Sequence, residues 1–217
     1  MKEQEIISKT ILYVKKELKG AEAGHDWWHI ERVLHNARNI AETEKVNMVI
    51  VELGALLHDI ADAKFHDGDE NIGPAKARQF LESHDVEENI INHVEQIIRH
   101  ISFKGGNESR RFFSPELAVV QDADRLDAMG AIGIARAFQY GGFKNREIYN
   151  PAIKPDLTMS RQAYKKSTAP TINHFYEKLL RLKDMMNTAA GKKMAAQRHT
   201  FMQDFLNQFY KEWEGKK

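Results

Sequence analysis

The sequence predicts an all-α protein built as a single domain over residues 1–217. In every apolar segment the apolar residues recur at steps of three or four, which is the period of a helix with one buried face. No alternating pattern long enough for a strand appears. No internal repeat or shift in composition marks a domain boundary, and 217 residues, 42% of them hydrophobic, suffice for one full core.

Each expected helix in the first part of the chain has its own signal. The first has apolar residues at Ile7, Ile11, Val14 and Leu18. The second, in "GHDWWHIERVLHNARNIAETE", repeats this step and has Asp26 as its expected N-cap. The segment "MVIVELGALLHDIAD" is apolar on most sides, which predicts a buried helix over 48–62. The segment "PAKARQFLESH" opens with Pro74 at the expected first helical position.

The remaining helices follow the same period. In "EENIINHVEQIIRHI" one face carries Ile90, Val94, Ile97, Ile98 and Ile101. The segment "PELAVVQDADRLDAMGAIGIARAF" is long and mostly apolar, which predicts a central helix over 115–138. Two further helices, near 170–188 and 190–213, are expected to pack on the core.

Composition excludes several kinds of function. The net charge is +1, so there is no general attraction to nucleic acid or to membranes. The chain has no Cys, which excludes thiolate metal sites, disulfides and cysteine nucleophiles. No apolar run reaches the roughly 18 residues of a membrane span, and the polar N-terminus lacks an apolar signal core. A cytoplasmic location is therefore expected.

The stretch "LLHDIAD" ends an apolar run with the adjacent ionisable residues His58 and Asp59. Charges that are buried are usually paired or bound to a metal. His29 shares the inward stripe of its own helix, and Asp124 and Asp127 share the inward face of theirs. Two imidazoles and two carboxylates suit Mn²⁺, Fe²⁺, Co²⁺ or Ni²⁺ better than Mg²⁺, which prefers oxygen ligands.

A structural interpretation of the same residues stays open at this point. An inward histidine such as His29, taken alone, is more often a hydrogen-bonded core residue than a metal ligand. Asp124 alone is explained by capping a neighbouring helix or by pairing with Arg125 or Arg136.

The order of these motifs resembles the HD superfamily of metal-dependent phosphohydrolases. The resemblance is carried by His29 followed by "IERV", then by "LLHD", then by "DADRLDA", and it extends over "GHDWWHIERV", "ALLHDIADAKF", "IIRHISFKGG", "VVQDADRLDAMGAIGIARAF" and "HFYEKLLRLKDMMNT". Together these look like a compact, single-domain bacterial branch of the superfamily. The resemblance implies an all-helical fold and a single divalent ion, with manganese the leading choice. It also implies four metal ligands: His29, His58, Asp59 and Asp124.

The resemblance also implies a proton-transferring residue. In related HD hydrolases an acidic residue three positions after the HD aspartate often has this role, and here that position is Asp62. The alternative is that Asp62 pairs with Lys64 or caps the helix end.

Substrate contacts are expected from residues around these motifs. They are His100, Lys104, Lys178, Asp127 and His25. The alternative for His100 is to support a metal ligand without touching the substrate, and the alternative for His25 is to cap the helix that follows it. The Gly- and Pro-containing segment 141–160 is expected to control access to the site. Tyr149 within it would either stack on a base or pin the segment to the core.

The leading function is hydrolysis of a nucleotide, releasing phosphate or pyrophosphate from a nucleoside phosphate. Alternatives are hydrolysis of an alarmone or a cyclic nucleotide, and a metal-stabilised binding or signalling module without turnover. The expected partner is a small nucleotide substrate, with neither nucleic acid nor membrane; a homodimer is left open. A basic stripe interleaved with aromatic residues, typical of nucleic-acid binding, does not appear.

Overall fold

The computed structural model describes residues 3–21, 24–61, 69, 71–101, 112–160, 163 and 166–216. Within these ranges all regular secondary structure is helical, so the all-α prediction is confirmed. The chain divides into two compact units, Met1–Asp124 and Arg125–Lys217. Among the described helices, none combines the length and the apolar character that crossing a membrane requires. The expected packing of the C-terminal helices on the core stays a prediction.

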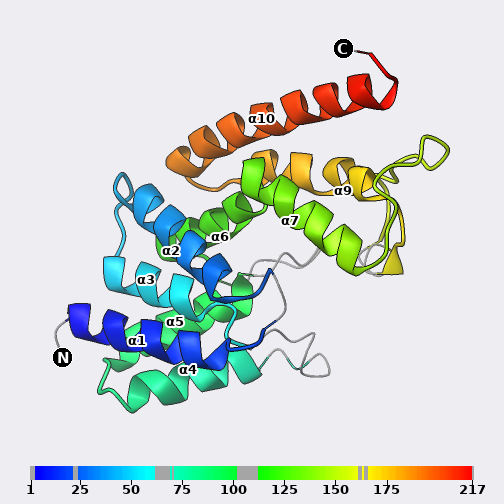
Figure 1. The fold of residues 1–217 in the computed structure, drawn as a ribbon. Coiled ribbons are helices and arrows are strands. Elements are labelled where there is room, and N and C mark those ends of the chain that lie inside the picture. Colours follow the sequence, from blue (N-terminus) through cyan, green and yellow to red (C-terminus); the bar gives the residue numbers. More distant parts are fainter. Residues whose placement is uncertain are drawn as a thin grey trace. The chain divides into compact units, whose positions relative to one another are not determined.

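The first unit is organised around one buried helix. Its helices are α1 (Glu3–Glu17), α2 (Trp27–Ala41), α3 (Met48–Leu57), α4 (Ile72–Glu82), α5 (Glu88–His100) and most of α6 (Pro115–Asp127). Helix α3 packs against α1, α2 and α5, and α4 pairs with α5 (Figure 1). Gly54 permits the close approach of α3 to α5, because a Cβ there would lie 3.1 Å from Cδ1 of Ile97. The sequence expectation of a buried helix at this position is thus met by α3.

Side-chain caps fix where two of these helices begin. The Asp26 carboxylate accepts a hydrogen bond from the backbone N–H of His29 at 3.0 Å, as expected for the N-cap of α2. Asn47 caps α3 in the same way through the N–H of Val49. Helix α4 begins at Ile72, two residues before Pro74, which was expected to be its first residue. Proline is tolerated there because the first N–H groups of a helix have no partner within it.

Several expected helix boundaries were wrong. The buried helix α3 ends at Leu57, so His58 and Asp59 lie in the turn that follows it. The long helix expected over 115–138 is two helices, because α6 ends at Asp127 and α7 begins at Gly130. Gly130 has a φ of +69°, in the left-handed region that glycine adopts without steric cost. On α5 the buried face includes Ile91 in place of Ile90.

The second unit comprises α7 (Gly130–Phe143), α9 (Thr171–Glu177), the 3₁₀ helix η2 (Leu179–Met185) and α10 (Ala189–Trp213). Helix α10 packs against α7 and η2, and α9 packs against η2 and α7 (Figure 1). An aromatic cluster joins α7, α9 and α10, with ring centroids of Phe138, Phe175 and Phe205 each 5.9 Å apart. The helix expected near 170–188 is therefore α9 followed by η2.

Three arginines of the second unit hold the last turn of α6. Arg125 donates to the carbonyl of Met185 at 2.6 Å, Arg198 donates to the carbonyl of Leu126 at 2.5 Å, and Arg136 donates to both the carbonyl and the carboxylate of Asp127. The last carbonyls of a helix lack partners within the helix, and a guanidinium satisfies them well.

A pair of glycines in α7 gives a matched test of packing. A Cβ at Gly133 would overlap the backbone carbonyl of Ala128, which cannot move aside, whereas a Cβ at Gly142 would meet nothing within 4 Å. We expect Gly133→Ala to lower the free energy of unfolding by about 1–3 kcal/mol through overpacking. Gly142→Ala should leave it unchanged or raise it by up to about 1 kcal/mol, since alanine favours the helix. Urea unfolding of both variants checks this, and equal stabilities would contradict the packing.

A partly buried histidine in the second unit predicts a pH effect on stability. Burial, together with the positive charges of Lys178 and Arg146, lowers the pKa of His174 to about 3. The ordinary histidine pKa is about 6.5, so between these values the unfolded chain binds one proton that the folded chain does not. Stability should therefore fall as the pH falls below about 6.5, with a slope of up to about 1.4 kcal/mol per pH unit from this residue.

The measurement compares the wild-type protein with His174→Gln by urea unfolding from pH 7.5 to pH 5. Excess chelator keeps metal ligation from contributing to either curve. The variant should lose less stability on acidification than the wild type. Parallel curves would show that His174 titrates normally in the folded protein.

Candidate metal centre

Two helices of the first unit and the turn that follows a third bring the predicted ligands together. Helix α2 supplies His29, the turn after α3 supplies His58 and Asp59, and α6 supplies Asp124. The potential ligand atoms of His29, His58 and Asp59 lie within 4.8 Å of one another. Oδ1 of Asp124 lies 3.6 Å from Nε2 of His29 and 4.0 Å from Nε2 of His58. The four residues proposed from the sequence therefore converge on one place.

One ring nitrogen of His58 has the properties of a metal ligand. Its Nδ1 lies 2.8 Å from the carbonyl oxygen of Ala55, and a carbonyl can only accept, so Nδ1 carries the proton. Its Nε2 is then a bare lone pair, which is buried and has no hydrogen-bond partner among the described residues. An unsatisfied buried polar atom is costly, and histidine ligands of metals typically donate their second N–H to a carbonyl in this way. The donor set thus fits a divalent ion.

Burial is graded across the cluster. The imidazoles of His29 and His58 are 3% and 4% exposed, while the side chains of Asp59 and Asp124 are 15% and 39% exposed. The ring centroids of the two histidines are 5.4 Å apart and nearly perpendicular. The nitrogen donors therefore form the inner wall of the site, and the carboxylates form the side that solvent reaches.

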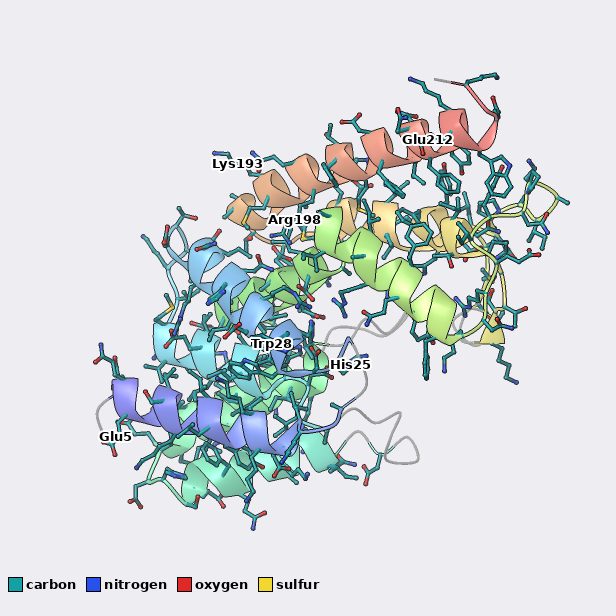
Figure 2. The ribbon with its side chains drawn as sticks, in the orientation of Figure 1. Glu5, His25, Trp28, Lys193, Arg198 and Glu212 are labelled. Atoms are coloured by element: carbon teal, nitrogen blue, oxygen red, sulfur yellow. The ribbon has the colours of Figure 1, made fainter. Side chains whose placement is uncertain are left out.

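The carboxylate of Asp59 is held by a histidine that precedes α2. Nδ1 of His25 lies 2.6 Å from Oδ2 of Asp59. Burial alone would raise the pKa of Asp59, but its interactions with the surrounding histidines, led by the hydrogen bond from His25, outweigh burial and lower the pKa below its ordinary value. Asp59 is therefore held in the ionised form that binds metals. Figure 2 shows His25 on the segment that leads into α2, with Trp28 on the first turn of that helix.

Sequence reasoning missed the contact between His25 and Asp59. The sequence placed His25 at the entrance of the site as a substrate contact or a cap. The two residues are 34 positions apart, so neither helical period nor motif spacing relates them. The only signal was that His25 directly precedes the N-cap of the helix that carries His29.

Of the other proposed substrate residues, His100 lies on α5, Asp127 and Lys178 belong to the second unit, and the rest lie outside the described residues. The ring of His100 bonds the Gln96 carbonyl of its own helix and lies 5.6 Å from the ring of Phe112. Asp127 is ion-paired with Arg136 in the second unit, which gives its carboxylate a structural partner. Lys178 is exposed at the end of α9. Asp62 and Lys104 lie outside the described residues, so their roles stay predictions.

The segment expected to control access begins inside α7 and is then tied to the second unit. Tyr149 packs edge-on against α10, with its ring centroid 5.3 Å from Tyr210 and 5.0 Å from Trp213. The side chain of Asn173 donates to the carbonyl of Ile153 at 3.1 Å. Of the two interpretations of Tyr149, the structure shows the one in which it pins the segment. Control of access by 141–160 stays a prediction.

A site that gathers two histidines and two aspartates from α2, α6 and the turn after α3 is of the kind that metal-dependent hydrolases use. Comparisons with known proteins give the family. The sequence profile of the HD domain matches residues 27–129. An uncharacterized protein of Bacillus subtilis, YpgQ, is 38% identical over 216 residues, covering 99% of this chain and 97% of YpgQ.

Solved structures agree with the sequence comparison. An HD-superfamily hydrolase from Bacillus thuringiensis is 45% identical with a TM-score of 0.80, covering 99% of this chain and 100% of that one. The structure of B. subtilis YpgQ in complex with ADP has 35% identity and a TM-score of 0.78, covering 98% of this chain and 97% of that one. The chain therefore belongs to the HD superfamily of hydrolases.

Proposed function

We propose that this protein is a metal-dependent phosphohydrolase that releases phosphate or pyrophosphate from a nucleoside phosphate. The observation that carries the proposal is the bare, buried Nε2 of His58 facing the carboxylate of Asp124, with His29 and Asp59 beside it. The ADP in the YpgQ structure supports a nucleotide as the ligand, since that chain is similar over almost its whole length.

His29, His58, Asp59 and Asp124 would hold the ion, and the mixture of imidazole and carboxylate donors favours Mn²⁺ over Mg²⁺. Such an ion supplies a Lewis acid for a phosphoryl oxygen and an activated water as the nucleophile. The four residues contribute by fixing its position. They come from α2, α6 and the turn after α3, and the potential ligand atoms of His29, His58 and Asp59 already lie within 4.8 Å of one another.

The proposed chemistry also needs a proton acceptor and phosphate-binding groups. Attack of water on phosphorus forms one P–O bond and breaks the P–O bond to the leaving group, and Asp62 would take the proton from the water or return it to the leaving oxygen. The proposed phosphate-binding residues are Lys104, Lys178 and His100, which donate hydrogen bonds or positive charge to phosphate oxygens.

The test is a nucleotide panel with metal-stripped protein supplied with Mn²⁺, Co²⁺, Ni²⁺ or Mg²⁺. The panel contains nucleoside mono-, di- and triphosphates, cyclic nucleotides and alarmones, with products separated by chromatography. We expect hydrolysis of a nucleoside phosphate that is faster with Mn²⁺ than with Mg²⁺. Running the reaction in ¹⁸O-labelled water identifies which phosphorus is attacked, which separates phosphate release from pyrophosphate release.

Three other outcomes would contradict the proposal. Hydrolysis confined to cyclic nucleotides or alarmones would support those substrates and reject the proposal. Tight metal and nucleotide binding without turnover would support a binding or signalling module. Equal activity in excess chelator would reject metal dependence.

A further inference from the structure

The pair formed by His25 and Asp59 has a consequence for the metal centre. The distance of 2.6 Å from Nδ1 of His25 to Oδ2 of Asp59 is short, as expected when the acceptor is an ionised carboxylate. A carboxylate only accepts, so Nδ1 of His25 carries the proton. The bond fixes the rotation of the Asp59 side chain and engages one of its two oxygens.

We propose that His25 is a positioning residue for the metal centre: by holding Oδ2 of Asp59, it presents the other carboxylate oxygen to the ion. This inference rests on the proposed metal-binding function. Groups that hydrogen-bond a ligand of a metal orient it, and their removal typically weakens metal binding about 10–100-fold.

The two residues directly before α2, His25 and Asp26, each contact one of the proposed metal ligands or its backbone. Asp26, next to His25, caps α2 through the backbone N–H of His29 at 3.0 Å. The start of α2 therefore sets the position of His29 through Asp26 and the orientation of Asp59 through His25. This explains why the segment "GHDWWH" places two polar residues directly before the helix that supplies the first ligand.

Burial supports an outer position for His25. Its side chain is 30% exposed, against 15% for Asp59 and 3% for His29. The ring centroids of His25 and His29 are 6.2 Å apart. His25 is thus the more exposed partner of Asp59, as expected for a supporting residue rather than the innermost ligand.

The test measures the Kd for Mn²⁺ by isothermal titration of metal-stripped protein, and the visible absorption of the Co²⁺ form. His25→Ala should raise the Kd about 10–100-fold. His25→Asn should lie closer to wild type than to His25→Ala, because an asparagine amide N–H can stand near the position of Nδ1 and donate to Oδ2. His84→Ala is the control: it removes a histidine of the same unit whose ring bonds the Phe80 carbonyl, and it should leave the Kd unchanged.

The outcomes separate this inference from the proposed function. A wild-type protein that binds neither Mn²⁺ nor Co²⁺ would overturn both. Wild-type binding with an unchanged Kd in His25→Ala would overturn only the role of His25, and an increased KM in that variant would then assign His25 to the substrate. A Kd that rises equally in His25→Ala and His25→Asn, with a changed Co²⁺ spectrum in both, would make His25 a ligand and likewise overturn the positioning role.

Discussion

Asp124→Ala should keep its fold and lose its metal. The Asp124 carboxylate reaches both buried imidazoles, at 3.6 Å and 4.0 Å, but is itself 39% exposed, so its removal leaves no cavity in the core. Removing a residue that only hydrogen-bonds a metal ligand typically weakens metal binding by up to about 100-fold. Removing Asp124, a proposed direct ligand, should weaken Mn²⁺ binding by more than that. Hydrolysis should fall in parallel, because in the proposed function the ion supplies the nucleophile. Metal analysis after gel filtration, with far-UV circular dichroism as the check on folding, measures this.

The control for Asp124→Ala removes an aspartate of the second unit. Asp184→Ala changes a side chain that is 79% exposed in the second unit and should retain full metal content. If folded Asp124→Ala kept full occupancy, the assignment of Asp124 as a ligand would be wrong.

Asp62→Asn should retain both metal and fold and lose most of its turnover. Asp62 follows Asp59 by three positions and is not needed to complete the four-residue donor set. Asparagine has nearly the same shape and still forms hydrogen bonds, but it cannot take up a proton. General acid–base help is worth about 10²–10⁴-fold in rate, or roughly 3–5 kcal/mol of barrier. The measurement is kcat at saturating Mn²⁺.

The matched control for Asp62 is Asp69→Asn, at an exposed aspartate of the same part of the chain. It should keep wild-type kcat. A decrease of less than tenfold in Asp62→Asn, in protein with wild-type metal content and melting temperature, would remove Asp62 from the mechanism. A decrease in melting temperature with normal turnover would instead make Asp62 structural.

Much of the fold was predictable because helical period is local information. The stripe from Val33 to Ala37 and the cap at Asp26 both depend on residues within a few positions of each other, and both are buried or bonded as expected. The same reasoning placed His29 and Asp124 on the inward faces of their helices, since a helix face fixes which side chains share a direction, whereas His58, expected within a helix, lies in the turn just after α3.

What the sequence could not predict depends on contacts between distant residues. The break between α6 and α7 requires Gly130 at a positive φ, beside the side chain of Arg198, and an apolar run continues through it without interruption. The bond from His25 to Asp59 likewise joins segments that only the packing of α2 beside α3 brings together. The pattern of neighbouring residues in the sequence predicts neither the break at Gly130 nor the bond from His25 to Asp59.

The spread of the donor set along the chain has a consequence for the lifetime of the protein. The candidate ligands lie at positions 29, 58, 59 and 124, so an ion that binds them joins α2, α6 and the turn after α3 and is bound by the folded chain alone. Metal at 100 times its Kd then adds about 2.7 kcal/mol to the free energy of unfolding. Proteases attack the rare unfolded molecules, whose number falls about 100-fold for that gain. We therefore expect the abundance of this protein in a growing culture to follow the supply of free divalent ion, with chains degraded fastest when the ion is scarce.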